Sequence, residues 1–216
     1  MIVSPGRGYV FVHAPKTGGT ALTLALEARA HRDDIIVGDT PKAKARRRRI
    51  AGVTTAGRLW KHSKLRDIRG LLPDATLDGL RPVTLVRNPW DRMISYYHWL
   101  RDQTFDHPAV RLARAVPFGD FVLDDATAAS FRANPYTSYV EGGRDPLFVR
   151  LEHLAADLAP FEDLLGFRLD VPRANESDRP DDWRALYDAR TTRRVAEICA
   201  ADISAFSYRF DPGDSA

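Results

Sequence analysis

Residues 9–28 read YVFVHAPKTGGTALTLALEA, and this stretch decides the fold. Its first five residues are β-branched, aromatic or otherwise apolar up to His13, which is typical of a short buried strand. Pro15 and the pair Gly18-Gly19 end the strand, and the apolar residues that follow Thr20 suit a helix. A strand, a glycine turn and a helix in this order open many nucleotide-binding α/β folds.

A second unit of the same kind occupies residues 82–101. We predict a buried strand over 83–86, a turn over 87–92 and an aromatic-rich helix over 93–101. A further strand is expected over 147–150, and the C-terminal half is expected to be largely helical, with helices at 108–115, 118–124, 151–165 and 181–206. The sequence therefore predicts a single α/β domain over 1–216: a P-loop-like, three-layer fold whose central parallel sheet is flanked by helices.

The composition is ordinary for a globular protein and limits the classes of partner. Of 216 residues, 44% are hydrophobic and 28% charged, and the net charge of +3 is too small to indicate nucleic acid. The one cysteine, Cys199, excludes an intramolecular disulfide and lies in an apolar stretch, so we predict that it is buried. The N-terminus does not resemble a signal peptide and no apolar run could span a bilayer, so a cytoplasmic location is expected.

One segment is strongly biased in composition: residues 42–49 read KAKARRRR. Such a run is either a solvated helix face or a docking surface for an anionic acceptor or partner. The sequence leaves both interpretations open.

The turn after the first strand has the composition of an anion site. Gly18 and Gly19 allow backbone angles that turn successive N–H groups into one concavity, and the helix that follows adds the positive end of its dipole. Lys16 supplies a full charge, and the hydroxyls of Thr17 and Thr20 are further donors. The alternative is an ordinary glycine turn in which Thr20 caps the helix.

The nucleoside-triphosphate P-loop is the obvious competitor, but its residues stand in a different order. In that motif the lysine follows the glycines, whereas Lys16 precedes them. The second strand, moreover, is followed by Arg87 and not by an acidic residue that would hold magnesium. An arginine at this place favours a bare anion.

Arg87 and Ser95 form the second candidate anion site. Ligands of open α/β sheets bind at the carboxyl ends of strands, which is where Arg87 stands, and Ser95 follows about two helical turns later. A guanidinium fork with a hydroxyl suits a terminal phosphate. The alternative is that Arg87 pairs with Asp91 or another acid and that Ser95 is incidental.

These two motifs resemble those of a known enzyme family. Residues 11–20 resemble the 5′-phosphosulfate loop of the sulfotransferases that use 3′-phosphoadenosine 5′-phosphosulfate (PAPS), and residues 86–97 resemble their 3′-phosphate motif. The branch that the chain resembles is the carbohydrate type, which includes heparan sulfate 2-O-sulfotransferase and small bacterial relatives. Weaker similarity extends to 151–154, 175–177 and 203–210. The glycine- and lysine-rich cofactor loop of the small-molecule enzymes is absent, and residues 173–179 stand in its place.

The resemblance implies transfer of a sulfuryl group from PAPS to a hydroxyl or amine, with a saccharide as the favoured acceptor and no metal. Lys16 would neutralise charge on the departing phosphate oxygen, while residues 17–20 hold the 5′-phosphate and Arg87 and Ser95 the 3′-phosphate. His62 is the leading candidate for the base, and His13 is its rival. Asn175 and Ser177 are candidates for closing over the nucleotide, although Ser177 also suits a helix cap.

Two other functions remain open at this point. The chain could be an ATP-dependent kinase of P-loop type, or a non-catalytic module that grips a polyanion. The acceptor and the oligomeric state do not follow from the sequence.

Overall fold

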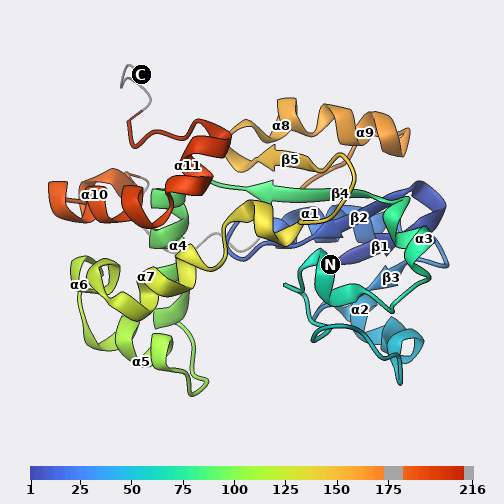
Figure 1. Ribbon diagram of the computed structural model, residues 1–216, viewed down its shortest axis with the longest axis horizontal. Coiled ribbons are helices and arrows are strands. Elements are labelled where there is room, and N and C mark those ends of the chain that lie inside the picture. Colours follow the sequence, from blue (N-terminus) through green and yellow to red (C-terminus); the bar gives the residue numbers. More distant parts are fainter. Residues whose placement is uncertain (173–181, 212–216) are drawn as a thin grey trace. The chain divides into compact units, whose positions relative to one another are not determined.

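The computed structural model describes residues 1–172 and 182–211 (Figure 1). The chain divides into two compact units. The first is built from Met1–Val86 and Tyr136–Asn175, and the second from Arg87–Pro135 and Glu176–Ala216. Each unit therefore combines two separate segments of the chain, and the prediction of a single domain stays a prediction.

A five-stranded sheet organises the first unit, in the order β3-β1-β2-β4-β5. Its strands are β1 (Ile2–Ser4), β2 (Tyr9–Val12), β3 (Ile35–Ile36), β4 (Arg81–Val86) and β5 (Leu147–Arg150). β2, β4 and β5 are parallel, whereas β1 pairs antiparallel with both β2 and β3. The predicted α/β class is confirmed, and β1 and β3 are additions that the sequence pattern did not reveal.

Both faces of this sheet are buried, as a three-layer fold requires. Tyr9 and Phe11 point to one face and Val10 and Val12 to the other, yet none of the four is more than 1% exposed. The face of Tyr9 packs against α1 (Gly19–Ala28), α8 (Leu154–Asp157) and α9 (Ala159–Leu165) in one hydrophobic cluster. In Figure 1, α8 and α9 run beside β5.

Short helices fill the remaining chain of the first unit. They are η1 (Pro5–Arg7), α2 (Pro41–Arg46), η2 (Arg47–Ile50), η3 (Leu65–Ile68), α3 (Asp74–Asp78), η4 (Tyr136–Tyr139) and η5 (Leu151–His153). Within the described residues, no helix combines the length and the apolar character that crossing a bilayer would require.

The second unit is helical. Its elements are α4 (Pro89–Arg101), α5 (Pro108–Ala115), α6 (Phe118–Leu123), α7 (Asp125–Arg132), η6 (Trp183–Leu186), α10 (Ala189–Ile198) and α11 (Ala200–Phe206). Their apolar faces meet in one core that includes Trp90, Tyr97 and Phe121. Cys199 lies in the same core at 4% exposure, and burial raises the pKa of its thiol to about 12, so the prediction that it is buried is confirmed.

Three predicted helix boundaries were wrong. The helix expected from 93 begins at Pro89, because the Asn88 side chain caps it by accepting the N–H of Trp90 at 3.1 Å. The helix expected over 181–206 is three pieces, since Asp188 forms a capping box with Thr191 that starts α10. The helix expected over 151–165 is likewise divided into η5, α8 and α9.

The basic run of residues 42–49 has two faces with different contacts. Lys42 donates to the carbonyl of Glu27 in the last turn of α1, where the helix dipole is negative. Arg46 and Arg49 donate to carbonyls of residues 31–34, which follow α1. Lys44, Arg47 and Arg48 lie on exposed positions. Three of the six cationic side chains therefore hold the end of α1 and the loop that follows it.

Candidate active site

The loop between β2 and α1 has the backbone geometry of an anion site. Lys16 and Gly18 both adopt left-handed angles, with φ of 65° and 79°, and Gly18 is the N-cap of α1. Concave loops of this kind turn N–H groups inward, and the first turn of a helix leaves N–H groups without an intrahelical acceptor. Gly19 and Thr20 lie in that first turn. The predicted order of strand, loop and helix N-terminus is thus present, and its use as a site for a phosphate-like group stays a prediction.

Thr17 differs from the prediction in one respect. Its side chain is fully buried, and its hydroxyl donates to the carbonyl of Ala14 at 2.8 Å. A hydroxyl has one proton to donate, so this group closes the loop internally and does not point its O–H at a ligand. The contribution of Thr17 to an anion would come from its backbone N–H.

The imidazole of His13 packs directly against Gly19 at the start of α1. A Cβ atom placed on Gly19 would lie 2.2 Å from Cδ2 and 2.4 Å from Nε2 of His13, so the imidazole occupies the space that only glycine leaves. The side chain of His13 is 7% exposed. These contacts favour a supporting role for His13 over that of the base.

The predicted base, His62, lies directly beside His13. The two imidazoles meet edge to face with their centroids 4.6 Å apart, and Nδ1 of His62 is 2.8 Å from the backbone carbonyl of His13. A carbonyl only accepts, so Nδ1 of a neutral His62 carries the proton and its Nε2 presents a lone pair. The backbone at the end of β2 thereby fixes the tautomer that a general base needs.

Burial keeps both histidines neutral at physiological pH. It lowers the pKa of His62 to about 4; the hydrogen bond to His13 opposes this, while the charge of Lys61 adds to it. Burial also holds the pKa of His13 well below its usual range, and the charges of Lys61 and Lys16 act in the same direction, as would a protonated Met1 amino group or a protonated His62. Perturbed titratable groups that gather beside an anion loop are typical of active sites.

The segment before His62 contains residues that sequence reasoning did not single out. Lys61 pairs with Asp39 at 2.8 Å, and the Trp60 ring meets the His62 ring edge to face with a centroid distance of 5.0 Å. Buried Ser63 accepts the N–H of Trp60 at 2.8 Å and holds this turn. Only the pattern of an aromatic residue two places before a candidate base could have pointed to Trp60.

In the second unit, Arg87 and Ser95 lie on one side of the start of α4. Nε of Arg87 donates to Asp91 at 2.8 Å, so the alternative pairing considered from the sequence is present. The side chains of Arg87 and Asp91 are largely buried. Ser95, one turn beyond Asp91 on the same helix, is also buried. The Asp91 carboxylate therefore orients the Arg87 guanidinium through its Nε.

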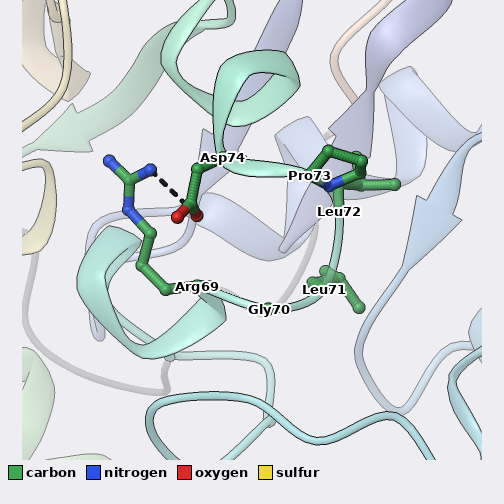
Figure 2. Close-up of a pocket in the computed structure, with 6 residues that line it drawn as sticks. All are labelled: Arg69, Gly70, Leu71, Leu72, Pro73 and Asp74. Atoms are coloured by element: carbon green, nitrogen blue, oxygen red, sulfur yellow. Dashed lines mark hydrogen bonds and ion pairs between the residues drawn. The ribbon is translucent and has the colours of Figure 1, made fainter.

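The remaining predictions lie elsewhere. Asn175 and Ser177 fall outside the described residues. In the part of the chain that the structure describes, no group of three His, Cys, Asp or Glu side chains could hold a metal ion. A hollow lined by residues 69–74 contains none of the predicted site residues, and Arg69 there is paired with Asp74 (Figure 2).

Comparison with known proteins found similarity among solved structures. No model of a known protein family matches the chain, and no curated protein sequence does. Among solved structures, the chain is similar to mouse sulfotransferase SULT7A1 in complex with PAP, with 15% sequence identity, 93% of this chain and 85% of that chain covered, and a TM-score of 0.49. At that level of similarity, a functional assignment has to come from the residues of this chain.

Proposed function

We propose that this protein is a PAPS-dependent sulfotransferase whose acceptor is a hydroxyl compound, with a saccharide favoured. The observation that carries the proposal is the pair of His62 and the anion loop: a neutral imidazole of fixed tautomer is held by the same strand end that leads into Lys16. A base beside an anion loop is what in-line transfer of a charged group requires.

The chemistry follows from these groups. The acceptor oxygen attacks sulfur, its proton passes to Nε2 of His62, and the bond between sulfur and the 5′-phosphate oxygen breaks. The products are a sulfate ester and adenosine 3′,5′-bisphosphate (PAP). Lys16 and the backbone N–H groups of residues 17–20 would stabilise the negative charge that develops on the departing phosphate.

The 3′-phosphate is assigned to the second motif. Arg87 follows β4 directly, and Lys16 belongs to the loop that follows β2, so each motif comes after a strand of the sheet. The buried guanidinium of Arg87, oriented by Asp91, would accept a doubly charged phosphate, and Ser95 would donate its hydroxyl.

Thermal unfolding with nucleotides tests the proposal. PAP at 100 times its dissociation constant should stabilise the protein by roughly 2.7 kcal/mol, and Lys16→Ala and Arg87→Ala should each weaken this effect. Transfer from labelled PAPS should fall by about 10²-fold or more in His62→Ala while PAP still binds. Stabilisation by ATP with magnesium but not by PAP would instead identify a kinase, and polyanion binding without any turnover would identify a binding module.

A further inference from the structure

Trp60 is an exposed aromatic residue in contact with the proposed base. Of the four tryptophans, Trp90 and Trp183 are buried and Trp99 is half-buried, whereas Trp60 is 44% exposed. Single exposed apolar residues are common on protein surfaces and need no function. Trp60 differs because its ring touches His62, with the two planes at 84°.

The turn that carries Trp60 is held rigidly. Ser63 is fully buried; its hydroxyl accepts the Trp60 N–H at 2.8 Å and lies 2.8 Å from the Arg58 carbonyl, to which it can donate. The N–H of Ser63 also donates to the Trp60 carbonyl at 3.1 Å. The indole is thus presented to solvent on a fixed backbone, which lowers the entropic cost of binding a ligand there.

The surroundings of the indole are cationic. The guanidinium of Arg58 lies over the indole ring at 5.7 Å from its centroid, and Lys61, which pairs with Asp39, is the next residue along the chain. Lys61, through its hydrogen bond and its charge, and Lys44, through its charge, lower the pKa of Asp39 on this side of the unit. A purely apolar ligand such as an acyl chain would be poorly matched to such a rim.

We propose that a pyranose ring of the acceptor stacks on the indole of Trp60 as a platform, so that a hydroxyl of this sugar reaches His62. A pyranose has an apolar C–H face that fits an indole and an oxygen-rich rim that fits Arg58, which no acyl chain offers. This inference rests on the proposed function and names the acceptor class of the same site. Trp60 would determine acceptor specificity, while His62 performs the proton transfer.

Acceptor kinetics test the platform. The probes are a glucose tetrasaccharide, a glucuronate-containing tetrasaccharide, and propanol and phenol as acceptors without a sugar ring. Trp60→Ala should raise KM for the better saccharide at least 10-fold and KM for propanol by much less, with the affinity for PAP unchanged. Trp60→Phe should recover part of the loss, and Phe105→Ala, which removes another exposed aromatic, should change nothing.

Two results would overturn the platform. One is a loss of turnover in Trp60→Ala that is equal for saccharides and propanol, because Trp60 would then only support His62. The other is a parent enzyme that prefers phenol or propanol to both saccharides.

A binding measurement keeps the inference separate from the proposed function. The indole N–H signal of Trp60, assigned by its absence in Trp60→Phe, should shift when either tetrasaccharide is added to the protein. An unmoved signal at millimolar saccharide would overturn the platform even if transfer from PAPS is observed. A protein that fails to bind PAP would overturn the proposed function, yet the indole signal would still report on the saccharide.

Discussion

Gly19 shows how a single residue couples the loop between β2 and α1 to the proposed base. The His13 imidazole fills the space beside its Cα, and the His13 carbonyl fixes the tautomer of His62. The sequence indicated Gly19 as part of an anion loop, but the reason that only glycine fits lies in packing against His13, which no local pattern encodes. The roles proposed for Lys16 and His62 come from the motif and the residue types. The hydrogen bond that orients His62 could not be predicted from the sequence.

Gly19→Ala should therefore destabilise the protein. The new methyl group would overlap the imidazole, and such overpacking costs about 1–3 kcal/mol unless His13 moves. Urea unfolding measures the loss. Gly79→Ala is the matched control, because its φ of −77° and nearest contact of 3.5 Å accept a methyl group. Equal stability of the two variants would contradict this account of the loop.

The depressed pKa of His62 predicts the pH dependence of stability. With a folded pKa of about 4 and an ordinary value near 6.5, the unfolded state binds the proton more readily between these values. The stability contributed by neutral His62 is complete above pH 6.5 and is lost as the pH falls toward 4, by an amount on the order of 1–3 kcal/mol. His13 acts in the same direction.

Urea unfolding from pH 7.5 to 4 should show this decline, and His62→Gln should make it shallower. Titration of the His62 ring by NMR gives the folded pKa directly. A value near 6.5 would contradict the burial of the ring that is described above.

Among the secondary-structure elements, the hydrophobic pattern predicted the strands that consist mainly of apolar residues. It predicted β2, β4 and β5 close to their observed bounds, and the burial of β2 and β4 on both faces explains their continuous apolar runs. It missed β1 and β3, which are too short to show a pattern; β1 pairs with β2, and β3 pairs with β1. Helix boundaries failed where a cap such as Asn88 or Asp188 decided them.

The charge of the basic run, residues 42–49, does not by itself indicate which of its side chains make contacts. Nη1 of Arg46 donates to the carbonyls of His31 and Asp34 at 2.8 and 3.1 Å, whereas Arg47 is exposed. Arg46→Ala should cost about 1–2 kcal/mol in urea unfolding because two carbonyls lose a charged donor, while Arg47→Ala should stay within about 0.5 kcal/mol. A larger effect of Arg47→Ala than of Arg46→Ala would show that the two faces were assigned the wrong way round.

The sheet of the first unit is completed by a segment that is distant from its other strands in the sequence. Residues 136–175 belong to the first unit although residues 87–135 separate them from the rest of that unit. β5 completes the parallel part of the sheet, and α9 places Phe161 against Tyr9 with ring centroids 5.1 Å apart. The sequence predicted a strand over 147–150, but its partner strand and the contacts of the helix behind it depend on topology.

The contact between Phe161 and Tyr9 predicts a position at which truncation of a side chain destabilises the first unit. Phe161 and Tyr9 are both almost fully buried, so Phe161→Ala leaves a cavity between segments from opposite ends of the unit. Such a substitution costs about 3–5 kcal/mol. Phe105→Ala removes a ring that is 48% exposed and should cost less than about 0.5 kcal/mol. Urea unfolding compares the two, and if Phe161→Ala proved as mild as Phe105→Ala, the segment 136–175 would not be part of the core of the first unit.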